Sequence, residues 1–200
     1  MVEAPLDDED DPDAAVDESF VEHHERMEDI KRTQGELKQA WQDTLEDMEA
    51  LAEERRADGF DVTAIAAVDA GPIGRDTTAD EGEFGMEFVI PDNRVDDFVD
   101  AFEAGDYPEY DVFRAEQASD AFIVEELRDP DAGRVILLAG AYALRDVTTC
   151  AYAARKEDEM YTFVRTLDGT RYGAFRHEGY RKFFPRADEL PEDPVEVAQF

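Results

Sequence analysis

Basic residues are scarce in this chain. Its 200 residues include 20 Lys and Arg against 53 Asp and Glu, so the formal net charge at pH 7 is −33. At low ionic strength this charge would repel itself and destabilise the compact state. At molar salt the Debye length falls to about 3 Å, and the repulsion is largely screened. Lysine is the scarcer base, with four residues against sixteen arginines. The composition therefore predicts a halophilic protein and argues against direct membrane association.

Cysteine and long apolar runs are also nearly absent. Cys150 is the only cysteine, so the chain cannot form an internal disulfide, as expected in a reduced cytoplasm. The longest apolar run, 135–144, spans ten residues, whereas a membrane-spanning helix needs about 20. The chain begins Met-Val-Glu without a basic and apolar leader, so we expect no secretion signal. These features predict a cytoplasmic protein.

A long helix is expected near the N-terminus. Residues 1–18 form an acidic, low-complexity tail that has little to bury and is expected to be disordered. Ser19 has the position of an N-cap and Gly59 that of a C-terminal stop, which predicts an amphipathic helix over 19–58. Its heptad repeat is regular over 37–51 and interrupted before it. We expect the second half to pack on the protein's own domain, while the first half projects or forms a coiled coil with another chain.

Beyond residue 59 the apolar residues alternate, which predicts strands. Expected strands are 62–68, 84–90, 112–117, 122–127, 135–144, 160–167 and 170–177, with helices from Pro91 to Gly105 and over 146–156. A polar loop is expected from Gly71 to Gly82. The order is α-ββ-α-βββ-α-ββ, and its short turns make most neighbouring strands antiparallel. The predicted fold class is α+β: a long N-terminal amphipathic helix, a mostly antiparallel sheet covered by helices over 59–186, and an acidic tail over 187–200.

No catalytic or metal-binding residue stands out. His23 and His24 are adjacent on the expected helix and face different directions, so they cannot readily hold one ion. Cys150 lies on the apolar face of an expected helix, which is typical of a buried, inert thiol. Paired carboxylates are so abundant that none marks an acid–base couple. We therefore assign no catalytic residue, no metal site and no cofactor.

The region from Met160 to Arg186 reverses the charge of the chain. It holds six basic residues against two acidic ones, a local charge of +4, with aromatic residues between them. Such surfaces suit anions, nucleic-acid bases or an acidic partner. The candidate binding residues are Arg165, Arg171, Tyr172, Arg176, His177, Tyr180, Arg181 and Lys182. The alternative stays open that the aromatic side chains are core and the arginines pair with carboxylates of the same chain.

The two strands of this basic region are separated by Asp168-Gly169, which predicts a two-residue type I′ hairpin. In that register Arg165 lies opposite Tyr172, and Tyr161 lies opposite Arg176. All four side chains would then share one face of the hairpin.

Eight short stretches carry a resemblance to known sequences. They are 89–93 (VIPDN), 110–115 (YDVFRA), 126–130 (ELRDP), 137–140 (LLAG), 160–162 (MYT), 166–170 (TLDGT), 175–177 (FRH) and 182–185 (KFFP). Through them the chain resembles an uncharacterised family of haloarchaeal proteins of about 200 residues, over about three quarters of its length. The resemblance implies a haloarchaeal cytosolic protein. It brings no established activity, so it assigns no functional residue.

Three functions follow as hypotheses. The first is a non-enzymatic interaction module, which binds an unidentified protein partner or forms a homodimer through the long helix. The second is association with RNA or ribosomes through the basic hairpin. At molar salt this would depend on stacking and hydrogen bonds, because counterion release contributes little there. The third is a small hydrolase that uses carboxylate chemistry.

Overall fold

A computed structural model describes the backbone of residues 18–75 and 82–190, and the side chains from residue 30 onward within these ranges. The chain divides into two compact units, Met1–Glu36 and Leu37–Phe200. The boundary between them falls within the first helix, α1 (Glu18–Ala57). The predicted N-terminal acidic tail up to residue 17 and the side chains of Ser19, His23 and His24 lie outside what the structure describes.

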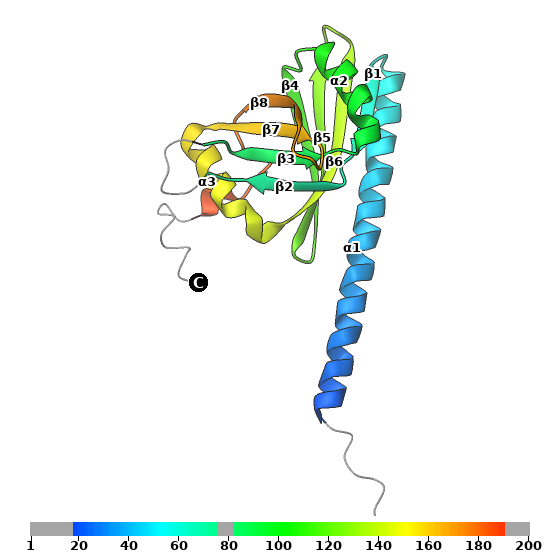
Figure 1. The fold of residues 1–200 in the computed structure, drawn as a ribbon, viewed down its shortest axis with the longest axis vertical. Coiled ribbons are helices and arrows are strands. Elements are labelled where there is room, and N and C mark those ends of the chain that lie inside the picture. The colour runs from blue at the N-terminus through cyan, green and yellow to red at the C-terminus, as the bar shows by residue number, and fades with distance from the viewer. Residues whose placement is uncertain (1–17, 76–81, 191–200) are drawn as a thin grey trace, which may run out of the picture. The chain divides into compact units, whose positions relative to one another are not determined.

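The second unit is built from two four-stranded sheets, whose strands run across one another (Figure 1). Sheet A has the order β1-β6-β5-β4, and sheet B has the order β2-β3-β7-β8. Sheet A contains β1 (Asp61–Ala66), β4 (Glu109–Gln117), β5 (Asp120–Asp129) and β6 (Arg134–Ala143). Sheet B contains β2 (Asp69–Ile73), β3 (Gly85–Val89), β7 (Glu159–Arg165) and β8 (Arg171–Glu178). The pairs β1–β6 and β3–β7 are parallel, and the other neighbours are antiparallel.

These elements confirm the predicted α+β class, with two differences. The strands form two sheets, because the chain leaves sheet A after Ala66, two residues before the end of the expected strand 62–68, and enters sheet B at Asp69. The second of these strands, β2, occupies part of the segment that was expected to be a loop. Pro72 is compatible with this position because β2 is an edge strand, one of the few places in a sheet where proline is found.

The main core lies between the two sheets and is closed by helices. These are α2 (Val95–Glu103) and α3 (Thr148–Glu157), with the short 3-10 helices η1 (Asp92–Arg94), η2 (Leu144–Val147) and η3 (Ala187–Glu189). The core residues include Ile65, Met86, Phe88, Phe98, Ile123, Leu138, Ala154 and Val164. Phe98 of α2 packs directly over Gly173 of β8, where an added Cβ would lie 2.9 Å from the ring. Glycine at this position therefore lets α2 approach the sheet closely.

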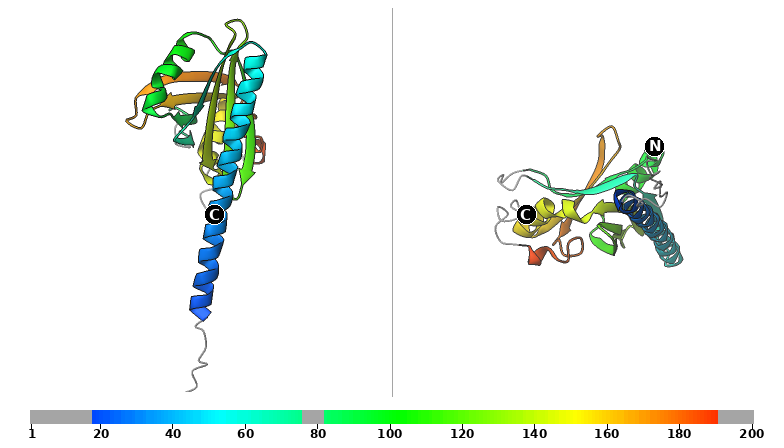
Figure 2. Two further views of the ribbon diagram at one scale, coloured as in Figure 1. Left: turned by 90° about the vertical axis from the view of Figure 1, so that its right-hand side faces the viewer. Right: turned by 90° about the horizontal axis from the view of Figure 1, so that it is seen from below.

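A second, smaller apolar layer joins α1 to sheet A. Met48 and Ala52 are buried against strand residues of sheet A, and Figure 2 shows the cyan end of α1 along these strands. The strand residues in the layer are Val124, Val135, Leu137 and Ala139. Trp41, Leu45 and Leu51 are partly buried on the same stripe. The regular part of the heptad repeat is therefore the part that packs on the domain.

Packed structure continues beyond β8, the last strand. Ala187 in η3 is buried and Leu190 packs against the main core, so the packed domain extends past residue 186 to residue 190.

In the part of the chain that the structure describes, no helix combines the length and the apolar character needed to cross a membrane.

Candidate functional site

The β7–β8 hairpin brings some of the candidate residues together and separates others. Opposite residues of an antiparallel pair share a face, and Tyr161 pairs with Arg176 while Phe163 pairs with Ala174. One face of the hairpin therefore carries aromatic, basic and acidic side chains. Its members are Glu159, Tyr161, Phe163, Arg165, Arg171, Ala174 and Arg176. The other face, which includes His177, is turned toward the core.

The predicted pairing of Arg165 with Tyr172 is wrong. Arg165 lies opposite Arg171, because the register shifts between Val164 and Arg165. Gly169 has φ +88°, whereas Asp168 is not among the residues with positive φ. A type I′ turn requires positive φ at both central residues, so the turn is of another kind. Tyr172 lies between Arg171 and Gly173, the partners of Arg165 and Val164, and has no opposite residue, so the shift is a bulge in β8.

The three arginines on the exposed face of the hairpin each bind a carboxylate of the same chain. Arg165 Nε lies 2.7 Å from Glu87 Oε1 of β3. Arg171 forms a two-pronged contact with Glu83, at 2.5 and 2.8 Å. Arg176 Nε donates to Glu159 Oε2 at 2.7 Å. These partners neutralise the positive charge that stands out in the sequence.

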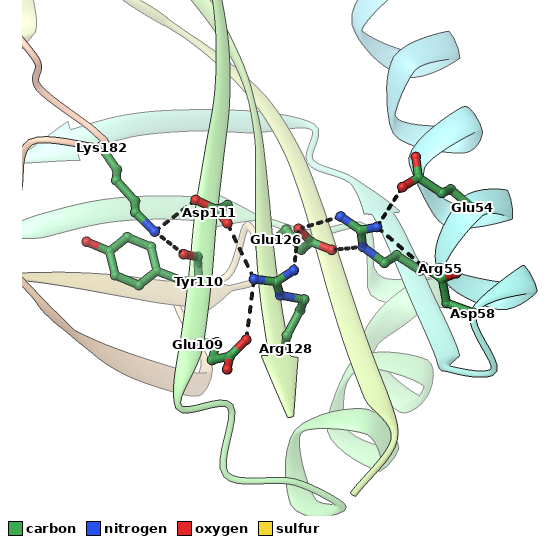
Figure 3. A network of polar contacts seen from close by, with 9 residues as sticks. All are labelled: Glu54, Arg55, Asp58, Glu109, Tyr110, Asp111, Glu126, Arg128 and Lys182. Atoms are coloured by element: carbon green, nitrogen blue, oxygen red, sulfur yellow. Dashed lines mark hydrogen bonds and ion pairs between the residues drawn. The ribbon is translucent and has the colours of Figure 1, made fainter. Parts of the chain in front are cut away.

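The residues after β8 lie elsewhere and are also paired. Tyr180 is buried and its hydroxyl donates to Asp188 Oδ1 at 2.7 Å, while Arg181 Nε donates to Asp188 Oδ2 at 3.1 Å. Lys182 contacts Asp111 at 2.8 Å and lies over the ring of Tyr110 (Figure 3). Tyr172 is half-buried against the core. The eight candidate residues therefore do not form one patch.

His177 belongs to a buried polar cluster between the two sheets. It is 3% exposed, and its Nε2 lies 2.9 Å from Thr162 Oγ1 and 3.2 Å from Glu125 Oε1. Thr162 Oγ1 in turn lies 2.8 and 2.9 Å from the two carboxylate oxygens of Glu125. Buried polar groups are normally hydrogen-bonded, as these are. The cluster therefore ties β5 of sheet A to β7 and β8 of sheet B.

The neighbouring carboxylate, Glu126, points to the opposite face of β5 and is fully buried. Arg55 of α1 donates to it from Nε at 2.5 Å and from Nη2 at 3.4 Å. Arg128 Nη1 lies 3.9 Å from the same carboxylate, and this guanidinium also reaches Asp111, which binds Lys182 (Figure 3). The network holds α1 on β5 and links it to β4. The pKa of Arg55 is raised, chiefly by its hydrogen bond to Glu126.

Sequence reasoning missed Glu125, Glu126 and Thr162. The signal was present as two adjacent acids inside the otherwise apolar strand 122–127. In a chain with 53 acidic residues this pair did not stand out. Glu125 binds side chains of sheet B, and Glu126 binds Arg55 of α1.

A cleft of about 530 Å³ opens on the exposed face of sheet B. Its floor holds Phe84, Tyr161 and Phe163: the first two rings meet edge to face at 5.5 Å, and the last two stack at 6.0 Å. The guanidinium of Arg75 lies 4.7 Å from the Phe84 ring centroid, and that of Arg171 lies 4.3 Å from that of Phe163. The cleft thus combines stacked aromatic rings with arginines placed on their faces.

Carboxylates at the edge of this cleft tune its electrostatics. Arg171 lowers the pKa of Glu83 through the hydrogen bonds between them. The Tyr161 hydroxyl donates to Glu159 at 2.8 Å, and this bond, followed by those from Arg176, lowers the pKa of Glu159. The same bond raises the pKa of Tyr161. At neutral pH the edge of the cleft therefore presents ionised carboxylates and arginines in pairs.

The single thiol does not contribute to this surface. Cys150 is fully buried in α3, and its sulfur lies 3.5 Å from the Gly85 carbonyl oxygen. Burial raises the pKa of Cys150 to about 12. Because the thiolate is the nucleophile, the environment of Cys150 suppresses its reactivity.

The fold and this cleft define an α+β protein with two crossed sheets and an aromatic–arginine surface on one of them. The model of a family of unknown function, DUF7529, matches residues 27–185. The chain belongs to this family, which confirms the resemblance to an uncharacterised family; the haloarchaeal origin stays a prediction. No curated protein and no solved structure matches the chain.

Proposed function

We propose that this protein is a non-enzymatic interaction module, and that it binds a segment of a protein partner in the aromatic–arginine cleft. The observation that carries the proposal is that Arg75 and Arg171 each lie over an aromatic ring of the same cleft. Aromatic residues and arginine are the residue types enriched at the centres of protein interfaces. A partner segment would place an apolar or aromatic side chain against the rings.

The ion pairs around the cleft favour a protein partner over a polyanion. The hairpin cations Arg165, Arg171 and Arg176 have carboxylate partners of the same chain, so the local field is close to neutral. A polyanion would have to displace these carboxylates without the gain from counterion release, which is small at molar salt. A protein carboxylate can exchange with Glu83 on Arg171 at little cost, because exposed ion pairs contribute only about 0–1 kcal/mol.

The composition favours a particular cellular environment for this module. The net charge of −33 and the excess of arginine over lysine favour a salt-rich cytoplasm of haloarchaeal type. A homodimer through the first half of α1 is a further element of the proposal. Light scattering at multimolar potassium chloride tests it directly, because a dimer doubles the measured mass.

The cleft is tested by photo-crosslinking at Ala174, which lines it and is exposed. A photoreactive phenylalanine analogue replaces Ala174, and the full chain is exposed to native lysate at high salt. The matched control places the same analogue at Ala115, an exposed alanine on a strand of sheet A. We expect a defined partner peptide to be crosslinked at Ala174 and not at Ala115, and the signal to fall with Arg171→Gln. Equal crosslinking at both positions would contradict the proposal, and crosslinked RNA at Ala174 would support the RNA hypothesis instead.

A further inference from the structure

A second cavity, of about 210 Å³ and partly open to solvent, lies away from the cleft, where β6 ends, α3 begins and the chain passes into η3. Its walls are mostly apolar, and the residues that form them include Leu144, Val147, Ala151, Phe184 and Leu190. An apolar cavity of about 150 Å³ is large enough to take up benzene. The present cavity therefore has room for a six-membered ring with one substituent.

A tyrosine hydroxyl in this cavity lacks a partner. Tyr142 lines the cavity and is only 4% exposed. Within residues 30–75 and 82–190, the structure gives its hydroxyl no hydrogen-bond partner. The Tyr142 hydroxyl oxygen is not among the fully buried side-chain atoms without a partner, so it is open to solvent in the cavity and accessible to an acceptor on a ligand. Burial raises the pKa of Tyr142, so the group stays a neutral O–H donor. The cavity thus contains an unused donor that suits an acceptor on a ligand.

Two arginines line the cavity together with Tyr142. Arg114 and Arg186 both line it, and both donate to one carboxylate, Glu116. These three side chains sum to one positive charge, in a chain whose net charge is −33. Arg114 is not saturated by this contact, since its Nε has no acceptor within the described part of the chain. The charge and the unused donor lie on the lining of the same cavity.

We propose that this cavity binds a small aromatic monocarboxylate. The ring lies between the apolar walls, with Leu144 and Phe184 on its faces, and the carboxylate accepts a hydrogen bond from Tyr142 at the end nearest Arg114. Burying the ring supplies the hydrophobic contribution, about 25 cal/mol per Å² of apolar surface. The arginine pair offsets the desolvation of the carboxylate. This site is separate from the cleft on sheet B, so the failure of either proposal leaves the other standing.

Benzoate is the probe, and the isosteric neutral amide benzamide is its control. Calorimetric titration of the full chain at constant high potassium chloride compares the two. We expect benzoate to bind at least tenfold more tightly than benzamide, because a hydrogen bond to a charged group contributes about 1.5–3 kcal/mol. Equal affinities, or no binding of benzoate, would overturn the proposal.

Two variants locate the site. Tyr142→Phe removes the hydroxyl and is expected to weaken benzoate binding roughly tenfold, while Tyr172→Phe, the same change at a half-buried tyrosine outside the cavity, leaves it unchanged. Arg114→Lys keeps the charge and removes Nε, and it decides the matter if Tyr142→Phe does not fold. We expect a several-fold loss for Arg114→Lys. Wild-type affinity in both folded variants would show that benzoate binds elsewhere and would overturn the assignment.

Discussion

The outer faces of the two sheets, which are turned away from the core between them, are built from different side chains. On sheet A the chain provides its own cover, since Met48 and Ala52 of α1 pack against aliphatic strand residues and Arg55 binds the buried Glu126. On sheet B the face of β7 and β8 carries rings, guanidinium groups and carboxylates that line a cleft. The face of sheet A is stabilised by burial of apolar area. The face of sheet B instead carries ion pairs between side chains, which a partner's charged groups can replace. The first face is covered by the protein's own helix, and the contrast supports the proposal that the second face binds a partner.

The largest effect is expected from removing salt. At neutral pH, dialysis from multimolar potassium chloride into low salt should abolish the fold, because a net charge of −33 is then unscreened. Circular dichroism reports the whole chain, and Trp41, the only tryptophan, reports the α1 layer by its fluorescence. We expect both signals to change in one transition. A cooperative thermal melt that persists in low salt would contradict this prediction.

The next effect concerns the buried ion pair on sheet A. Arg55→Met removes the closest partner of Glu126, which is 0% exposed, and should lower the free energy of unfolding by about 3–5 kcal/mol. The control is Arg56→Met, one residue along the same helix. The Arg56 side chain is 44% exposed and contacts Glu49 at 2.8 Å, so its loss should cost about 1 kcal/mol or less. Denaturant unfolding of both variants at the same high salt compares them. Equal losses would show that Glu126 finds another partner once Arg55 is gone.

The contrast between the faces also explains which features the sequence predicted. The α1 stripe was predictable because heptad spacing is local, and Trp41, Leu45 and Met48 are the residues that pack. The α+β class was predictable from the change of period after Gly59. The second sheet was not, because local alternation does not show which strands pair. The strand β2 was missed for the same reason, since Pro72 is acceptable only on an edge whose existence depends on the whole sheet.

The candidate site was harder to predict because its arginines pair with carboxylates that lie far away in the sequence. Counting cations found the hairpin, but the partner of Arg171 is Glu83, 88 residues earlier in the chain. The type of turn between β7 and β8 was also ambiguous in the sequence. Asp-Gly fits a type I′ turn, yet here only the glycine has positive φ, and Asp168 accepts from the Thr166 hydroxyl at 2.6 Å. With this turn, Arg165 lies opposite Arg171 instead of Tyr172.

The smallest effect on stability is expected on sheet B. In Arg171→Gln the charged partner of Glu83 is lost, but the Glu83 side chain is 60% exposed, so unfolding should change by about 1 kcal/mol or less. The pKa of Glu83 should rise toward its ordinary value, because its hydrogen bonds from Arg171 are what lower it. A carboxyl whose pKa is lowered by folding adds stability above its unfolded pKa and loses it as the pH falls through the folded pKa. The difference between the wild type and Arg171→Gln should therefore be present at pH 7 and vanish well below pH 4.5, the ordinary value for glutamate.

Carbon NMR titration of Glu83, together with thermal melts at the two pH values, measures this difference. The same variant should lose most of the crosslinking at Ala174, which separates a role in binding from a role in folding. A loss of stability as large as that of Arg55→Met would place Arg171 among the residues that hold the fold. Both faces would then stabilise the fold, although their side chains differ. The proposal that the cleft binds a partner would lose its main support.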